Sequence, residues 1–323
     1  MRAIVQDRYG PAEVLELREV ERPAVGSGEV LVRVHAAGVD RGVWHLMTGL
    51  PYPVRLAYGP RRPRTPTPGM DLAGVVVDVG PDVTRFRPGD EVLGIGVGTF
   101  ADYARAPEAK LVAKPAGLTF EQAAVVAISG ATALQAVRDH GRVRPGQQVL
   151  VIGASGGVGS YAVQIAKAFG AEVTGVASST KLDLVRSLGA DHVVDYTRED
   201  FADGSRRYDV VIDIGGNAGL SRLRRALTPT GTAVITGGET GGRWLGGYDR
   251  QLRASLLSPF VGQRLTTFVN KEALEDLVAL AELLEAGKVV PAVDRAFPLA
   301  DAAKAVRYVE EGHARGKVVV TVA

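Results

Sequence analysis

Hydrophobic and polar positions in the first third of the chain follow patterns that predict β-strands. The segments EVLVRVHAAG (29–38) and DLAGVVVDVG (71–80) are rich in β-branched residues, and Gly80-Pro81 closes the second. A further strand, in RPGDEVLGIG (87–96), follows another Pro-Gly turn. We therefore expect residues 1–120 to form a β-rich lobe, with the Pro- and Arg-rich segment 55–68 as an exposed loop.

The pattern changes at Thr119. Thr119 and Gln122 have the spacing of a capping box, and apolar residues then recur at helical spacing, which predicts a helix over 119–140. Strands and amphipathic helices alternate from about residue 145. Continuous apolar runs separated by helices are typical of a parallel sheet covered on both faces. The strands are expected at 148–153, 172–177, 192–196, 209–214, 232–236 and 264–269.

The predicted fold class is therefore α/β, with a doubly wound, six-stranded parallel sheet of the Rossmann type over residues 121–289. A helix at 272–286 ends at Gly287. The tail, 290–323, contains one more helix and the strand KVVVTV. We expect this tail to return to the β-rich lobe, because the central sheet already has its six strands.

Composition narrows the possible functions. The chain has 323 residues, of which 46% are hydrophobic and 23% charged, and this is typical of a globular protein with two lobes. A net charge of +2 gives no electrostatic argument for nucleic acid or an anionic membrane as partner. The absence of cysteine excludes disulfides, iron–sulfur clusters and cysteine-containing zinc sites. With no apolar leader and no apolar run of membrane-spanning length, a cytoplasmic location is expected.

A glycine-rich turn follows the strand expected at 148–153 and precedes a helix. Its sequence is the dinucleotide fingerprint with the first glycine replaced by alanine. Glycines let backbone amides approach a pyrophosphate, and the helix N-terminus adds partial positive charge there. A purely structural turn is the alternative interpretation. The residues expected to bind the cofactor here are Ala154, Ser155, Gly156, Gly157, Val158 and Gly159.

Along essentially its whole length the chain resembles the medium-chain dehydrogenase/reductase superfamily. Within it, the chain is most similar to the zinc-free quinone oxidoreductase branch, which includes the reticulon-interacting-protein-like NADPH reductases. Besides the fingerprint, the resemblance is carried by GEVLVRVHAAGVD, PGMDLAGVVVDVG, RFRPGDEVLG, LGADHVVDY and GHARGKVVVTV. It implies that residues 1–120 form a GroES-like lobe, which the tail rejoins, and that an active cleft lies between this lobe and the Rossmann lobe.

Two departures from relatives matter for the chemistry. Zinc members of the superfamily place Cys in the segment from Ala37 to Arg41 and a His-Glu pair where this chain has Met70-Asp71. No metal site is therefore expected, and a zinc-type alcohol dehydrogenase becomes a disfavoured alternative. Relatives in the quinone branch usually carry Asn or Ser at the position of Asp40, and often Asp at that of Val43.

Cofactor choice is expected to depend on the residues after the second Rossmann strand. NAD enzymes usually carry an acid there, whereas this chain offers Ser178, Ser179 and Lys181. Hydroxyls and an ammonium suit the 2′-phosphate of NADPH, and Tyr196 resembles a tyrosine that flanks this phosphate in relatives. The alternative is a solvated turn that caps the next helix.

Further cofactor contacts are expected beyond the two phosphate turns. The resemblance suggests Ser129, Thr132, Gly237, Phe268 and Val269 around the nicotinamide. The alternative for the helical Ser and Thr is simple packing or bonding to the helix backbone. Ligands of open α/β sheets bind at the carboxyl edge, where the fourth strand is followed by Gly215, Gly216 and Asn217, for which a plain turn is the alternative.

Substrate contacts are expected from the segment VDRGVWHLMTGLPY (39–52). Asp40, Trp44, His45 and Tyr52 are its polar or aromatic side chains, and we consider Asp40, His45 and Tyr52 as candidate catalytic residues. His45 is able to donate a proton near neutral pH. The alternatives are a helix N-cap for Asp40 and a packed structural role for His45.

The sequence thus predicts a metal-free reductase that transfers a hydride from NADPH to a quinone or an α,β-unsaturated carbonyl. Such acceptors stabilise the incoming charge by conjugation, so the enzyme mainly supplies orientation. A non-enzymatic, NADPH-binding partner or structural protein is the alternative. The strand RLTTFV (264–269) is expected at a sheet edge, which relatives pair across a twofold axis, and a homodimer is therefore expected.

Overall fold

The computed structural model describes residues 1–216, 218–237 and 242–322, and the chain divides into two compact units. Unit 1 comprises Met1–Ala131, Glu272–Ala286 and Pro291–Ala323, and unit 2 comprises Thr132–Lys271 and Gly287–Val290. Within the described ranges, no helix has both the length and the apolar character needed to cross a membrane.

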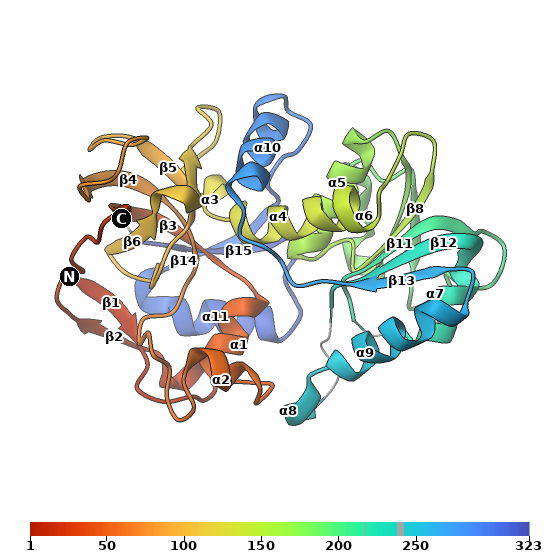
Figure 1. Ribbon diagram of the computed structural model, residues 1–323, viewed down its shortest axis with the longest axis horizontal. Coiled ribbons are helices and arrows are strands. Elements are labelled where there is room, and N and C mark those ends of the chain that lie inside the picture. The colour runs from red at the N-terminus through yellow and green to blue at the C-terminus, as the bar shows by residue number, and fades with distance from the viewer. Residues whose placement is uncertain (217, 238–241, 323) are drawn as a thin grey trace. The chain divides into compact units, whose positions relative to one another are not determined.

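Unit 1 is built on a seven-stranded sheet in the order β14-β15-β3-β4-β5-β7, with β6 paired to β3 (Figure 1). Neighbouring strands are antiparallel except β14 and β15, and a separate hairpin is formed by β1 (Arg2–Val5) and β2 (Glu16–Glu19). The strands of the sheet are β3 (Glu29–Val39), β4 (Asp71–Val79), β5 (Glu91–Ile95), β6 (Tyr103–Pro107), β7 (Leu111–Ala113), β14 (Val293–Pro298) and β15 (Lys317–Thr321).

The C-terminal strand completes this sheet. Val318 of β15 lies opposite Val39 of β3, and both side chains are buried. The apolar face of α11 (Ala302–Glu310) covers this part of the sheet, with Ala302, Ala305 and Val306 buried. The consecutive valines Val318, Val319 and Val320 of the tail are all buried, so they belong to the core of unit 1. The other helices of the unit are α1 (Arg41–Thr48), α2 (Val54–Tyr58), α3 (Phe120–Ala123) and α10 (Leu274–Glu285).

Three local expectations differ from the structure. The loop predicted at 55–68 begins with the short helix α2. The helix predicted over 119–140 is divided into α3, α4 (Ala127–Gln135) and a π-helical turn (Ala136–His140), although the capping box of Thr119 and Gln122 is confirmed. The interruption lets the amide of Ile128 donate to the carboxylate of Asp71. Helix α10, expected in the Rossmann lobe, belongs to unit 1.

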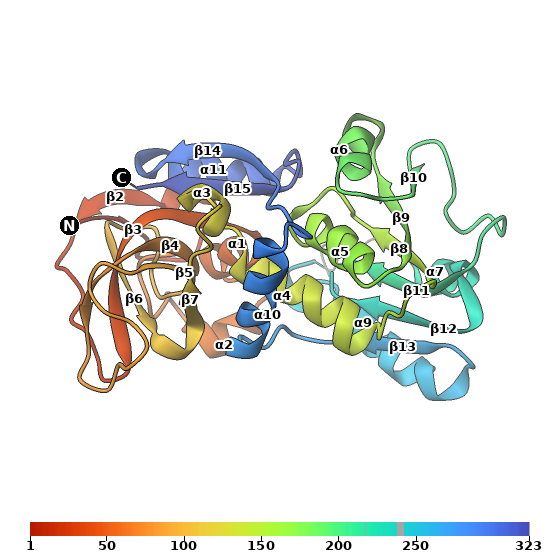
Figure 2. The ribbon, with the colours of Figure 1, turned by 90° about the horizontal axis from the view of Figure 1, so that it is seen from above.

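Unit 2 confirms the predicted Rossmann sheet. Its six strands are parallel and follow the order β10-β9-β8-β11-β12-β13. Helices α5 (Gly157–Ala168) and α6 (Leu182–Ser187) cover one face, and α7 (Leu220–Ala226) and α9 (Tyr248–Leu257) cover the other (Figures 1 and 2). The strands are β8 (Gln148–Ile152), β9 (Glu172–Ala177), β10 (His192–Asp195), β11 (Tyr208–Asp213), β12 (Leu227–Ile235) and β13 (Arg264–Thr267).

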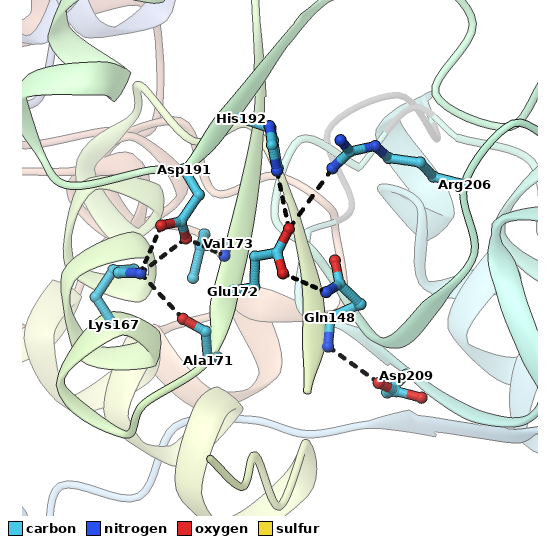
Figure 3. A network of polar contacts seen from close by, with 9 residues as sticks. All are labelled: Gln148, Lys167, Ala171, Glu172, Val173, Asp191, His192, Arg206 and Asp209. Carbon is cyan, nitrogen blue, oxygen red and sulfur yellow. Dashed lines mark hydrogen bonds and ion pairs between the residues drawn. The ribbon is translucent and has the colours of Figure 1, made fainter. Parts of the chain in front are cut away.

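A polar network joins the amino ends of β8, β9 and β10 (Figure 3). Glu172 accepts hydrogen bonds from Gln148 at 2.6 Å and from the ring of His192 at 2.9 Å. Lys167 of α5 donates to Asp191 at 2.8 Å, and the amide of Val173 donates to the same carboxylate at 2.7 Å. This network therefore stabilises the amino edge of the sheet, and the glycine turns lie at the opposite, carboxyl edge.

Candidate cofactor-binding and catalytic site

The turn between β8 and α5 contains two glycines, Gly153 and Gly159, at positions where a side chain would be strained or would clash. A Cβ at Gly159 would lie 2.0 Å from the carbonyl oxygen of Gly153, and Gly153 itself has φ +83°. Gly156 is the N-cap of α5, and its amide donates to that same carbonyl at 3.1 Å. The first amides of a helix lack intrahelical acceptors, so this turn presents free donors beside an open backbone. This cradle fits a pyrophosphate.

Alanine at the first fingerprint position is explained by packing. Ala154 is fully buried, and a Cβ at Gly175 of β9 would lie 3.1 Å from the Cβ of Ala154. The methyl group of Ala154 thus fills space between β8 and β9. Ser155 is also buried, whereas Gly156, Gly157 and Val158 are half-buried.

The turn after β9 does not present all of its hydroxyls to solvent. Ser179 donates a hydrogen bond to the carboxylate of Asp195 at the end of β10, and Thr197 donates to the same group through its amide at 3.0 Å and its hydroxyl at 2.7 Å. These bonds hold the pKa of Asp195 below its usual range. Ser178 and Lys181 are half-buried beside this turn, and Tyr196 is 57% exposed.

The turns after β11 and β12 are held together by one arginine. Arg250 of α9 pairs with the buried carboxylate of Asp213, and it donates to the carbonyls of Ala218 at 2.7 Å and Gly237 at 2.8 Å. Burial raises the pKa of Asp213, and Arg250 opposes that rise. Gly216 donates its amide to Asp213 at 3.2 Å.

Close approach of the backbone is required here as well. A Cβ at Gly237 would lie 2.1 Å from the carbonyl oxygen of Ile214. The amides of Ile214 and Gly215 both donate to the last residue of β8, Ile152, at 3.1 Å. Because β8, β9, β11 and β12 are parallel, all of these turns lie at one edge of the sheet. Asn217, also expected at this edge, lies outside the described residues.

A cavity of about 630 Å³ opens at this edge of unit 2. It is lined by the turn after β11 and the start of α9, namely Gly216, Gly219, Leu220, Leu245, Gly247, Asp249, Arg250 and Arg253.

Besides Gly237, three residues expected near the nicotinamide belong to unit 2, namely Thr132, Phe268 and Val269. Gln135 exchanges two hydrogen bonds with the backbone of Lys271, at 2.7 and 3.1 Å, and thereby fixes the segment after β13. In this segment the ring of Phe268 stacks on His140 at 4.2 Å, while Val269 is 78% exposed. Thr132 is half-buried on α4.

The candidate catalytic residues of unit 1 have structural partners. Asp40 is the N-cap of α1 and accepts from the amide of Val43 at 3.1 Å. His45 bonds through Nδ1 to the carbonyl of Leu50 at 2.7 Å and contacts the ring of Trp44. Tyr52 is half-buried, with the guanidinium of Arg55 4.9 Å from its ring centre. The cap expected as the alternative for Asp40 is therefore present, and His45 has a packed environment.

Sequence reasoning missed a buried charged cluster in unit 1. Lys317 of β15 donates to Ser129 of α4 at 2.9 Å and to Asp71 of β4 at 3.5 Å, and it lies 3.8 Å from Asp40. Ser129, expected at the cofactor, thus has its hydroxyl bonded to Lys317. The available signal was a charged residue at the start of each of two apolar strand segments, DLAGVVV and KVVVTV. Across the described ranges, no three His, Cys, Asp or Glu side chains form a group suited to a metal ion.

Comparison with known proteins agrees with this architecture. Residues 26–116 match the alcohol dehydrogenase GroES-like domain, and residues 188–320 match a family described as zinc-binding dehydrogenase. The chain is 34% identical to a chloroplastic quinone-oxidoreductase, QR1, of Triphysaria versicolor, over 99% of this chain and 98% of that protein. It is 33% identical to the mitochondrial NAD(P)H oxidoreductase RTN4IP1 of Mus musculus, over 100% of this chain and 89% of that one.

The fold is similar to that of a solved quinone oxidoreductase from Coxiella burnetii. The TM-score is 0.85 at 30% identity, and the similarity covers 100% of this chain and 99% of the other.

Proposed function

The chain is a member of the medium-chain dehydrogenase/reductase superfamily, in its quinone-oxidoreductase branch, and from this premise we propose that it is an NADPH-dependent reductase of quinones or α,β-unsaturated carbonyls. The coarser activity is that of an NAD(P)H-dependent oxidoreductase. The observation that carries the finer proposal is the set of polar groups after β9, where Ser178 and Lys181 stand in place of an acid.

The glycine turns at the carboxyl edge of unit 2 fit a dinucleotide. The amides of Gly157 and Val158, the first two residues of α5, would hold the pyrophosphate, and Ser178 and Lys181 would hold the 2′-phosphate. When bound, NADPH supplies the hydride at C4 of its nicotinamide. The protein binds and orients both reactants, and a conjugated acceptor spreads the incoming charge over its own π-system.

A direct test is rapid mixing of the protein and NADPH with 9,10-phenanthrenequinone, 1,2-naphthoquinone or a simple enone, followed by the absorbance of NADPH. We expect turnover with at least one acceptor, and slower turnover with NADH. Tight NADPH binding without reduction of any acceptor would instead support a non-enzymatic, NADPH-binding role. The substitution of Asp40 for the usual Asn or Ser is the observation that favours this second candidate.

A zinc-type alcohol dehydrogenase is disfavoured because the chain has no cysteine to serve as a thiolate ligand. Stoichiometric zinc in the purified protein would overturn this argument. The proposed partner is a small-molecule acceptor. No nucleic-acid or membrane partner is proposed, and a cytoplasmic location stays a prediction.

We also propose a homodimer. Strand β13 is at the edge of the sheet, and its open backbone edge suits pairing with the same strand of a second copy across a twofold axis. Sedimentation at micromolar concentration should show a species larger than the 34.0 kDa chain. A single species of 34.0 kDa would refute the dimer.

A further inference from the structure

Four segments of unit 1 bring polar side chains to one buried point. Val318 of β15 is paired with Val39 of β3 in an antiparallel register. Lys317 directly precedes Val318 and Asp40 directly follows Val39, so the two side chains lie opposite each other, 3.8 Å apart. Asp71 begins β4, and Ser129 is in the first turn of α4. Asp71, Lys317 and Ser129 are almost completely buried, whereas the side chain of Asp40 is 12% exposed. Asp40 is therefore the member that reaches the surface.

Gly38 makes this arrangement possible. A Cβ at Gly38 would lie 2.9 Å from the carboxylate of Asp71 and 2.6 Å from the carbonyl oxygen of Ala124. The second oxygen of Asp71 accepts from the amide of Ile128 at 2.8 Å. Gly38 thus leaves room for Asp71, the Ile128 amide fixes one of its oxygens, and Ser129 accepts a hydrogen bond from the ammonium of Lys317.

The cluster contains two carboxyl groups and only one ammonium. If all three groups were ionised, one negative charge would be buried without compensation, which is costly in a low-dielectric interior. Burial raises the pKa of Asp71 to about 7, with Lys317 lowering it and Asp40 raising it further. Such interacting groups take up a proton as a unit rather than singly.

The neighbouring elements contribute few other charges. From β15 and the end of β3, Lys317 and Asp40 are the charged side chains that act on Asp71 within the described residues, and α4 contributes the amide of Ile128 and the hydroxyl of Ser129. Arg41, which follows Asp40, has its guanidinium 5.2 Å from the centre of the Trp44 ring.

We propose that Asp40, Asp71 and Lys317 hold one exchangeable proton in common, and that Asp40, at the exposed end of the cluster, passes this proton to the reduced acceptor. The inference rests on the proposed reductase function. Asp40 is the catalytic residue in it, and Asp71 and Lys317 are positioning residues that act through Asp40.

Reduction of the acceptor needs one hydride and one proton. The acceptor receives a hydride, which carries two electrons and one proton, and becomes a hydroquinone anion or an enolate. The O–H bond of Asp40 then breaks, and a new O–H or C–H bond forms on the acceptor, which becomes neutral. Asp40 is left as a carboxylate, and the cluster regains its proton from water.

The first experiment measures the shared proton without any turnover. Infrared spectroscopy of the protein without cofactor should show the band of a protonated carboxyl group that disappears as the pH rises through neutrality. In Asp40→Asn the remaining Asp71 and Lys317 are balanced, so the band should disappear at a more acidic pH. Asn is also a good N-cap, so this variant should fold. Asp71→Asn should likewise lose the neutral titration, and Asp78→Asn, on the same strand and exposed, should keep it.

The second experiment measures kcat for phenanthrenequinone against pH. In the wild type kcat should fall as the cluster loses its proton near pH 7. In Asp71→Asn one carboxyl group faces one ammonium, so the cluster no longer holds an uncompensated charge and the fall of kcat near pH 7 should be absent. At pH 7 this variant should retain its KM and lose about tenfold in kcat.

These two experiments distinguish the sharing of the proton from its delivery to the acceptor. A neutral carboxyl titration that is unchanged in Asp40→Asn would overturn the shared proton. A titration that behaves as expected, with an unchanged pH profile of kcat in Asp71→Asn, would overturn the delivery of this proton to the acceptor. If the wild type reduces no acceptor, the proposed function fails, and proton delivery fails with it, while the infrared result still decides whether the proton is shared.

Discussion

The hydroxyl of Ser179 donates a hydrogen bond to the carboxylate of Asp195, linking the turn after β9 to the end of β10. Asp195 is almost fully buried and also receives two hydrogen bonds from Thr197. The acid at the end of β10 thus accepts its hydrogen bonds from groups of the protein itself. Ser179 therefore has a structural role, and within the proposed NADPH site Ser178 and Lys181 are the residues left to discriminate a 2′-phosphate.

The first prediction separates these roles. Lys181→Ala and Ser178→Ala should each weaken NADPH binding by about ten- to a hundredfold and leave NADH nearly unchanged, because a hydrogen bond to a charged group contributes roughly 1.5–3 kcal/mol. Ser178→Asp should reverse the preference. Ser179→Ala should weaken both cofactors equally, since it disturbs the turn. Fluorescence titration gives the dissociation constants of both cofactors for each variant and the wild type, and equal losses of both cofactors in Lys181→Ala would disprove the phosphate site.

A second prediction concerns Arg250. Arg250→Met removes the partner of the buried Asp213 and two bonds to backbone carbonyls, so unfolding in urea should show a loss of about 3–5 kcal/mol. Binding of NADPH and NADH should weaken together. The double variant with Asp213→Asn should recover part of the stability. Arg253→Met, which breaks an exposed pair with Asp249, is the matched control and should cost under about 1 kcal/mol.

The Rossmann sheet could be predicted because its strands are continuous apolar runs of the right length, separated by amphipathic helices. The β8–α5 turn could be predicted because its glycines are required by contacts within a few residues of each other, as Gly153 and Gly159 show. A local sequence pattern is sufficient to predict a feature when the contacts that require it are also local.

The buried pairs could not be predicted in the same way. Lys317 and Asp71 are 246 residues apart, and Arg250 and Asp213 are 37 residues apart. The local pattern does not show which charged residue of an apolar strand forms an ion pair. The partner depends on the register of the strands and on the return of the C-terminal tail to unit 1. The break between α3 and α4 could not be predicted for the same reason. It accompanies a hydrogen bond from the amide of Ile128 to Asp71 of β4, which is distant in the sequence.

The third prediction is a pH dependence of stability at the amino edge of the Rossmann sheet. Burial opposes ionisation of Asp191, but hydrogen bonds from Lys167 and the amide of Val173 hold its pKa below the usual range. Because the pKa is lowered in the folded state, this stabilisation is present above the unfolded pKa of about 3.9 and is lost as pH falls through the folded value.

Lys167→Met should therefore reduce the free energy of unfolding by about 1 kcal/mol at pH 7, a value kept small by partial exposure of the pair. The difference from wild type should shrink below about pH 4. Arg186→Met, in an exposed pair with Asp183, is the control and should have little effect at either pH. A difference that stays constant from pH 7 to pH 3 would show that Lys167 acts through packing alone.

The last prediction concerns the exposed face of α9. Tyr248, Leu252, Leu256 and Phe260 follow one another at intervals of four residues and are 48%, 61%, 64% and 86% exposed. Residues four apart on α9 lie on the same helix face, so Tyr248, Leu252 and Leu256 form one apolar stripe, and Phe260 follows in the 3-10 turn Ser258–Phe260. Helix α9 packs beside β13, the strand at the sheet edge, so the stripe extends the surface already proposed to pair with a second copy.

If a second copy covers this stripe, two charges placed on it should separate the subunits. We expect Leu252→Glu with Leu256→Glu to sediment as a 34.0 kDa species while keeping its fold and its NADPH affinity, because neither residue belongs to the cofactor turns. Leu56→Glu, at a side chain 79% exposed on α2 of unit 1, is the matched control and should leave the dimer intact. A double variant that still sediments as a dimer would show that the subunits meet elsewhere. If Leu56→Glu also dissociated the dimer, an added negative charge at any exposed position would be sufficient to separate the subunits. The result would then give no support for placing the stripe in the interface.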